Sequence, residues 1–281
     1  MHTTADTAAL AERIRTLRRL LTQWRQWERM QATTTNPAEL QRLRHRLQQL
    51  LTQTRAWEWQ ALWEVLERHL DRFDTELPHR WEQWRVHWVT RLQEALGPDA
   101  DVLRVRGTAL SWRMLRLEPD LERDRVRILY GPDRLDARPA DPVRLARWLR
   151  QWYRDLTRRA RPPEQFIPVL ARAYRRAQTT GHHTSPVPIM AVYRELVILA
   201  QPNAFWADAR PRAFRAYPRY LFSYELALLR RVPADTAAHH VRLITAPFAT
   251  THRRSDYIWV PEGDTPEGTR YAWIEVTAKS L

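Results

Sequence analysis

The chain has 281 residues, of which 44% are apolar, enough to bury a core in one large domain or two ordinary ones. It contains no cysteine, which excludes a disulfide framework, thiolate zinc sites and cysteine nucleophiles. Its 46 lysines and arginines outnumber its 32 acidic residues, and the resulting net charge of +14 favours an anionic partner such as nucleic acid.

Every basic residue except Lys279 is an arginine, and the chain also has 14 tryptophans. The guanidinium group of arginine forms bidentate hydrogen bonds to phosphate and carboxylate groups, and it stacks on aromatic rings. This composition therefore suits a surface that binds phosphates and bases. A GC-rich genome would explain the choice of arginine over lysine whatever the function, but it would not explain the net charge.

The sequence also indicates a cellular location. No run of about 18 apolar residues occurs, and the first ten residues lack a basic stretch followed by an apolar core. The absence of cysteine fits a reducing compartment. We therefore expect a cytoplasmic protein with no membrane partner.

Residues 1–96 are predicted to form an antiparallel coiled-coil hairpin. The first seam alternates spacings of four and three and consists of Leu10, Ile14, Leu17, Leu21 and Trp24. A start signal at residues 36–39, Asn-Pro-Ala-Glu, opens a second helix that we expect to be interrupted at Pro78. The four residues that connect the two helices are too few for the helices to run parallel, so they are expected to pack antiparallel.

The second of these helices carries tryptophans that the first helix is too short to cover. The candidate interface residues are Trp57, Trp63, Trp81, Trp84 and Trp88. They either fill the core of this chain or dock a second copy or another protein, since aromatic residues are enriched in interface cores.

Residues 97–162 are predicted to form a small antiparallel sheet followed by a basic helix. Apolar residues recur at a spacing close to every second position at 102–106, 111–117 and 126–130, which indicates three strands. A helix over about 141–159 then places arginines on one side, and its candidate phosphate contacts are Arg147, Arg150, Arg154 and Arg158. The alternative is a helix face that is merely solvated.

Residues 163–281 are predicted to be helical and winged-helix-like, ending in a β-hairpin. Three helices near 164–178, 189–201 and 218–231 precede strands near 240–245, 256–260 and 270–277, which is the element order of a winged helix. In that order, residues 218–231 take the recognition position and residues 256–277 form the wing.

The loop before the third of these helices interleaves arginines with aromatic residues. Its candidate phosphate contacts are Arg210, Arg212, Arg215 and Arg219. In a competing but compatible interpretation, Phe205, Trp206, Phe214 and Tyr217 anchor the loop on the core while the arginines project outward. Arginines displayed on such a loop could pair with phosphates and stack on exposed bases.

No catalytic, cofactor or metal signature stands out. The pairs His182-His183 and His239-His240 lack acidic ligands at zinc-like spacing. Asp256, Glu275 and Lys279 resemble the acid-acid-lysine set of restriction-type nucleases, but the lysine follows the second acid by four positions instead of two. We therefore expect no cofactor, no metal and no enzymatic activity, with a divergent metal-dependent nuclease as a remote alternative.

The fold expected overall is α+β and mostly helical. We predict a non-enzymatic accessory protein that binds the phosphate backbone of nucleic acid, DNA in the first instance, and assembles with a protein partner or a second copy through its N-terminal helices. This order of parts is similar, at the level of architecture alone, to accessory subunits beside DNA-acting ATPases in genome maintenance or phage defence. The alternative is an interaction scaffold that docks an acidic partner through its tryptophan- and arginine-rich helix.

Overall fold

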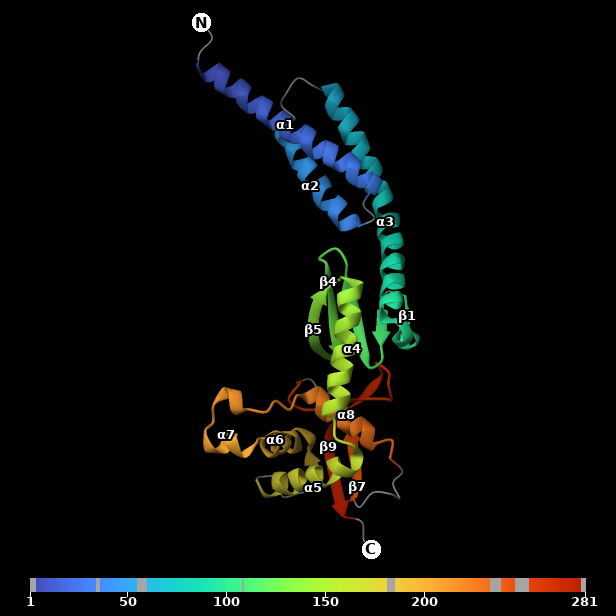
Figure 1. Ribbon diagram of the computed structural model, residues 1–281, viewed down its shortest axis with the longest axis vertical. Helices are drawn as coiled ribbons and strands as arrows, with labels where there is room; N and C mark the ends of the chain where they lie inside the picture. The colour runs from blue at the N-terminus through green and yellow to red at the C-terminus, as the bar shows by residue number, and fades with distance from the viewer. Residues whose placement is uncertain are drawn as a thin grey trace. The chain divides into compact units, whose positions relative to one another are not determined.

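The computed structural model describes residues 4–33, 36–54, 60–107, 109–180, 185–232, 239–245 and 253–278. In these residues it contains eight α-helices and two antiparallel sheets (Figure 1), which confirms the predicted α+β, mostly helical class. Contacts divide the chain into two compact units. These are Met1–Ala95 with Asp120–Arg125 and Pro139–Val143, and Leu96–Pro119 with Val126–Arg138 and Arg144–Leu281. Most of residues 97–162 thus belong to one unit with residues 163–281.

The first unit is built on three helices instead of the two expected. They are α1 (Thr4–Thr33), α2 (Pro37–Thr54) and α3 (Gln60–Leu96). The start signal of α2 acts as predicted, because Oδ1 of Asn36 accepts the Ala38 N–H at 3.0 Å. The predicted second helix is divided into α2 and α3, so the first unit is more than a hairpin.

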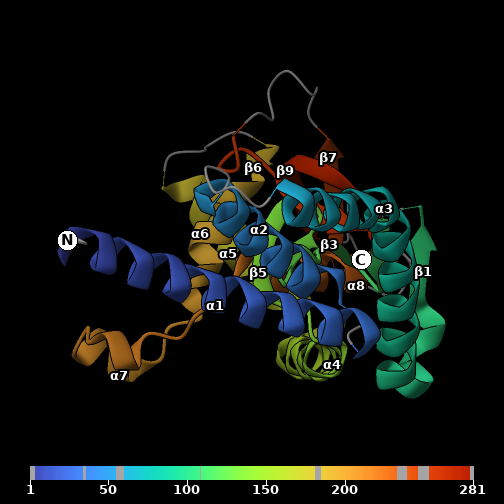
Figure 2. The same ribbon diagram turned by 90° about the horizontal axis from the view of Figure 1, so that it is seen from above.

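A single apolar core joins α1, α2 and the first half of α3. Its buried residues are Leu20, Trp27, Leu40, Leu43, Leu47, Leu51, Leu66, Leu70 and Phe73. The rings of Trp27 and Phe73 meet edge to face with centroids 4.7 Å apart, a favourable aromatic arrangement. Figure 2 shows α2 lying against α1 in this unit.

The buried face of α1 differs from the predicted seam. Ile14 and Leu21 are 42% and 52% exposed, whereas Leu20 and Trp27 are only 2% and 1% exposed. The prediction assumed that a single helix packs against α1, which would bury only a narrow stripe of residues at the a and d positions. With two helices packed on α1, the larger Trp27 and the neighbouring Leu20 are buried, and two members of the predicted seam remain at the surface.

Pro78 lies inside α3, so the predicted interruption there is wrong. A proline within a helix removes one backbone hydrogen bond, at a cost of about 3 kcal/mol. Phe73 before it and Trp88 after it are both buried. Burial on either side of the proline can offset the lost bond and keep the helix continuous.

The five-stranded sheet is a meander in the order β1-β2-β3-β4-β5. Its strands are β1 (Leu103–Arg106), β2 (Ala109–Trp112), β3 (Leu115–Asp120), β4 (Arg125–Tyr130) and β5 (Asp133–Pro139). The predicted strands 102–106 and 126–130 match β1 and β4, whereas the single strand predicted over 111–117 is divided by a turn into β2 and β3, and β5 was not predicted. Helix α4 (Pro142–Arg159) follows it and buries Leu145, Leu149 and Leu156.

The remaining elements form a second sheet with helices packed on it. The helices are α5 (Pro163–Thr179), α6 (Ile189–Leu199), α7 (Asn203–Ala207) and α8 (Arg219–Leu229), and the strands are β6 (Val187–Pro188), β7 (His239–Thr245), β8 (Ile258–Pro261) and β9 (Gly268–Ala278). The sheet order is β6-β9-β7, and β8 also pairs with β9. Helices α5 and α6 contact β9, and α8 contacts β8. Figure 1 shows α5 and α6 beside β9.

One tight contact between the two sheets involves Gly131 and Trp259. Gly131 has φ +58°, and a Cβ built there would lie 2.2 Å from the Trp259 indole. We expect Gly131→Ala to lower the free energy of unfolding by about 2–4 kcal/mol, through a positive φ and overpacking. Gly263→Ala is the control, because Gly263 also has a positive φ, +72°, but no atom within 4 Å of the added Cβ. Equal losses in denaturant titrations of the two variants would contradict this account.

Candidate functional site

Helix α4 presents a continuous arginine face, with its leucines on the buried side. Arg147, Arg154 and Arg158 are exposed and Arg150 is half-buried. Arg154 donates to Oε1 of Gln151 at 3.0 Å, and Arg158 forms an ion pair with Asp155 at 2.7 Å. Arg147 and Arg150 have no partner among the residues that the structure describes. The helix therefore displays an excess of fixed positive charge.

The loop between α7 and α8 places three more of the predicted arginines at the surface. Arg210 pairs with Asp208, and Arg212 and Arg215 are exposed. Gln201 holds the loop, because its side chain accepts the Arg215 N–H at 2.9 Å and donates to the Arg215 carbonyl at 3.1 Å.

Only part of the expected aromatic anchoring of this loop occurs. Tyr217 is buried, and its carbonyl accepts a hydrogen bond from the Tyr193 hydroxyl at 2.8 Å. Trp206 is 59% exposed and Phe214 is also exposed, so the anchoring interpretation does not hold for these two residues. The two rings instead flank Phe205, with centroids 5.3 and 5.9 Å from it.

Arg219 differs from the other predicted phosphate contacts because the protein already holds its guanidinium. Its side chain is only 17% exposed and lies 3.7 Å from Asp133. It donates to the Tyr257 carbonyl at 2.6 Å and to the Arg254 carbonyl. Burial lowers the pKa of Arg219, and the nearby Asp133 carboxylate opposes that shift. Arg219 therefore shapes a pocket and is not a free surface cation.

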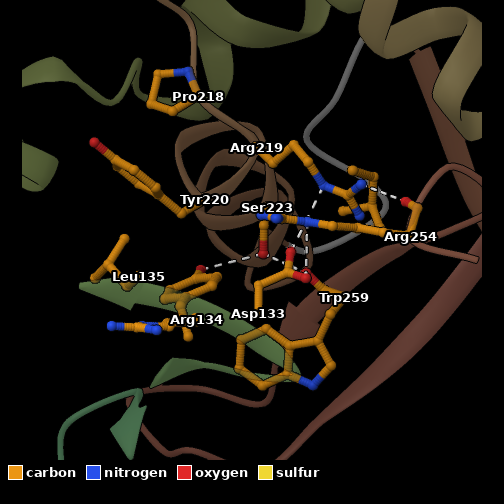
Figure 3. Close-up of a pocket in the computed structure, with 11 residues that line it drawn as sticks. Asp133, Arg134, Leu135, Pro218, Arg219, Tyr220, Ser223, Arg254 and Trp259 are labelled. Carbon is orange, nitrogen blue, oxygen red and sulfur yellow. Dashed lines mark hydrogen bonds and ion pairs between the residues drawn. The ribbon is translucent and has the colours of Figure 1, made fainter. Parts of the chain in front are cut away.

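That pocket is a cavity of about 220 Å³ between β5, the start of α8 and β8. Figure 3 shows Arg219 and Arg254 converging on Asp133, with Tyr220 on the opposite side and Trp259 below. Arg254 pairs with Asp133 at 2.9 Å. The pocket thus combines cationic groups with aromatic walls.

A buried hydrogen-bond chain holds the floor of the pocket. The hydroxyl of Tyr130 lies 3.1 Å from Oγ of Ser223, which donates to the Trp259 carbonyl. Burial raises the pKa of Tyr130, which keeps it protonated as a donor. This chain joins β4, α8 and β8, so the walls of the pocket are fixed relative to one another.

Helix α8 is buried along nearly its whole length. Every residue from 221 to 227 is buried, and the three acidic or hydroxyl side chains in that run, Ser223, Tyr224 and Glu225, bond inside the protein. A helix in this position cannot insert its side chains into a DNA groove. The recognition role expected for residues 218–231 is therefore not compatible with the burial of these side chains.

Glu225 carries a buried carboxylate that accepts three contacts. Its oxygens receive the Tyr217 hydroxyl and the Arg161 N–H, the latter at 2.9 Å, and the Arg161 guanidinium lies 3.9 Å away. Burial raises the pKa of Glu225, and these hydrogen bonds and the Arg161 charge oppose the shift. The carboxylate ties α8 to the segment that precedes α5.

This raised pKa predicts a pH dependence of stability. The folded state binds the Glu225 proton more tightly than the unfolded state does, so stability falls as pH rises from about 4.5 through the raised pKa. In Glu225→Gln this component should vanish, and the stability difference between variant and wild type should change in favour of the variant as pH rises. Glu164→Gln, at an exposed residue of α5, is the control. Parallel stability curves for wild type and Glu225→Gln, measured by urea unfolding, would contradict the prediction.

The tryptophans predicted to form an interface have different environments in the structure. Trp88 is buried, and its indole N–H donates to the Ala140 carbonyl at 2.5 Å, so it belongs to the core of this chain and not to an interface. Trp81 and Trp84 are half-buried, and Trp84 lines a cavity of about 560 Å³ in the first unit. Trp57 and the side chain of Trp63 lie outside the described residues.

The residues considered for metal chemistry are engaged in separate contacts. Asp256 accepts the Ser255 hydroxyl at 2.9 Å, while Glu275 binds Arg242 at 2.8 Å and Ser185 at 3.0 Å. Lys279 and the pair at 182–183 lie outside the described residues. Within the described part of the chain, no group of three or more His, Asp or Glu side chains could hold a metal ion.

Sequence reasoning missed one group of residues, an aromatic cluster beside the pocket. Trp148 and Trp152 on α4 stack with ring centroids 6.4 Å apart, and Tyr220 lies 5.8 Å from Trp152. The four-residue spacing of the two tryptophans indicated a shared helix face. Nothing in the sequence indicated that Tyr220 meets them.

Comparison with known proteins finds no matching family model, no matching curated protein and no matching solved structure. The described helices include none that is long and apolar enough to cross a membrane.

Proposed function

We propose that this chain is a non-enzymatic protein that binds the phosphate backbone of nucleic acid. The observation that supports this most is the arginine face of α4, where Arg147 and Arg150 have no partner among the described residues. A surface cation that no acid neutralises is available to replace a counterion of the nucleic acid, which is the main source of backbone affinity.

The spacing of this face suits a phosphate backbone. From Arg147 to Arg158 the helix rises about 16 Å. A DNA strand carries one phosphate about every 3.4 Å along the helix axis, so four arginines over this length can contact several successive phosphates. Contacts of this kind position the protein without reading base sequence.

We propose a winged-helix-like arrangement for residues 163–281, in a modified form. The order α5-β6-α6-α7-α8-β7-β8-β9 resembles that of a winged helix with α7 and β8 added, and the pairing of β6 with β9 supports it. Because α8 is buried, this unit would bind without inserting a helix into the major groove. Binding independent of sequence is the consequence.

The helices of the first unit would then provide assembly. By architecture, the partner that we propose is a DNA-acting ATPase in genome maintenance or phage defence. An exposed apolar stripe on α1, with Ile14 and Leu21 at the surface, is the observation that favours a coiled-coil contact.

The test is equilibrium binding of the purified chain to labelled duplex and single-stranded DNA at about 50 mM salt, with recovery of the DNA after incubation with Mg²⁺. We expect submicromolar binding and intact DNA. Cleaved DNA would favour the nuclease alternative, and absence of binding at this salt would overturn the proposal.

The second candidate is a scaffold that docks an acidic partner through its tryptophan- and arginine-rich helix. The exposed apolar residues of α1 favour a further contact, with a second copy of the chain. Arg18 and Arg25 lie beside Ile14 and Leu21 on the exposed side of the helix. For a scaffold, Ile14→Ser with Leu21→Ser should abolish oligomerisation, measured by light scattering, without lowering the melting temperature. If the protein is such a scaffold, the wild type should also fail to bind nucleic acid.

A further inference from the structure

Two hollows of the second unit share one aromatic wall. The pocket described above has a volume of about 220 Å³, and a second hollow beside α4 has about 200 Å³. Tyr220 lines both of them, and Trp148 and Trp152 line the second. The two hollows therefore adjoin each other at Tyr220.

The aromatic side chains around Tyr220 are exposed to different degrees. Trp148, Trp152 and Tyr220 are half-buried, while Tyr130 and Trp259 beneath them are buried with centroids 5.0 Å apart. The buried pair supports the walls, and the half-buried rings leave part of their surface open to the hollows. The indole N–H of Trp152 is itself buried and has no hydrogen-bond partner among the described residues.

Cations surround these rings. Arg134 is exposed and has no partner among the described residues. Arg254 is 60% exposed and bonds Asp133 through Nε, which leaves its terminal nitrogens for another acceptor. The guanidinium of Arg138 lies 5.2 Å from the Trp148 ring. Among the described residues that line the first hollow, Asp133 is the single acid beside Arg134, Arg219 and Arg254, so these side chains give it a net positive charge.

The second hollow is also continuous with the arginine face of α4. Gln151 and Asp155 line it. These are the residues that bind Arg154 and Arg158, at 3.0 and 2.7 Å. A chain of phosphates that follows the α4 arginines therefore passes along the edge of this hollow.

We propose that the two hollows accept unpaired bases of a single-stranded nucleic acid, with Tyr220 as the stacking wall and Arg134 and Arg254 on the adjoining phosphates. This inference rests on the proposed function and makes it specific. Bases inside a duplex are covered by their neighbours and cannot enter a hollow, whereas the bases of a single strand present open faces to aromatic side chains. Stacking of this kind tolerates any base sequence.

The test compares Tyr220→Leu with Tyr220→Phe on a labelled 12-nucleotide single strand and on a duplex of the same length. We expect the wild type to bind the single strand more tightly than the duplex. Tyr220→Leu should weaken single-strand binding by about 5- to 150-fold, the effect of losing one stacked base. It should leave duplex binding unchanged, and Tyr220→Phe should bind like the wild type because it keeps the ring.

Thermal melting of each variant checks that it folds. If Tyr220→Leu does not fold, Arg134→Gln with Arg254→Gln decides instead, because both side chains are at the surface of the site. Selective loss of single-strand affinity in that variant supports the inference, and unchanged affinity overturns it.

The remaining outcomes separate the inference from the function on which it rests. Equal binding of both DNAs by the wild type, unaffected by Tyr220→Leu but weakened by loss of the α4 arginines, overturns the single-strand site and leaves backbone binding in place. No binding of either DNA overturns both. If a nucleoside monophosphate at the same concentration as the single strand displaces that strand, the hollows bind a free nucleotide. This result would overturn the proposed single-strand site.

Discussion

Replacing Arg147, Arg150, Arg154 and Arg158 together by alanine is expected to weaken DNA binding by up to about 10³-fold at about 0.1 M salt. Each arginine that neutralises a duplex phosphate contributes about 0.9 to the slope of log K against log salt, so the slope should flatten by up to about 3.6. Contacts to a single strand contribute about 0.7 each, and a flattening of up to about 2.8 is expected there. Measuring the slope for the wild type and for this variant distinguishes lost phosphate contacts from a general loss of binding activity.

The fold of this variant should be nearly unaffected. The four side chains lie on the outer face of α4, their two surface interactions with Gln151 and Asp155 are worth well under 1 kcal/mol each, and alanine is the best helix former. Melting of the variant within a few degrees of the wild type would establish this.

The matched control removes the same charge from the other unit. Arg18, Arg19, Arg25 and Arg29 are exposed residues of α1, and their replacement by alanine lowers the net charge by the same amount. If the α1 variant and the α4 variant lose the same affinity, net charge alone drives binding and α4 is not the contact surface. An unchanged slope in the α4 variant would equally contradict the assignment.

The second large effect concerns the core of the first unit. Trp27→Ala should lower the free energy of unfolding by about 3–5 kcal/mol, because it removes a ring that is 1% exposed and packs against Phe73. Part of this cost is the transfer of the ring to water, and the rest is the cavity that α2 and α3 leave unfilled. Urea unfolding of the whole chain measures it.

Leu21→Ala is the control on the same helix. Leu21 is 52% exposed, so its loss should change stability by less than about 0.5 kcal/mol. A larger loss for Leu21→Ala than for Trp27→Ala would mean that the predicted seam, and not the observed one, is the buried face of α1.

The local signals in the sequence were the ones that predicted structure well. The cap at Asn36 and the arginine spacing of α4 depend on residues close in the chain, and both are present. Strand β5 was missed because it begins at an aspartate, ends at a proline and has no clear alternation of buried and exposed residues. The two-residue strand β6 has no sequence signal of its own, since it exists by pairing with Ile274 and Trp273 of β9.

The errors at the candidate site have a common cause. Arg219 was grouped with exposed arginines because its burial depends on Asp133 and on carbonyls of residues 254 and 257, which are distant in the sequence. The hollow beside Tyr220 likewise requires α4 and α8 to meet. Charge and periodicity can predict a basic helix face, but they cannot predict which aromatic rings the fold will bring beside it.

The most direct test of backbone binding is the salt dependence of wild-type affinity for a short DNA, measured over a range of about 50–200 mM salt. We predict a straight log-log plot with a slope of about −3 or steeper, as expected for four or more phosphate contacts. A slope near zero, or no binding at the lowest salt, would contradict the account and direct attention to a protein partner.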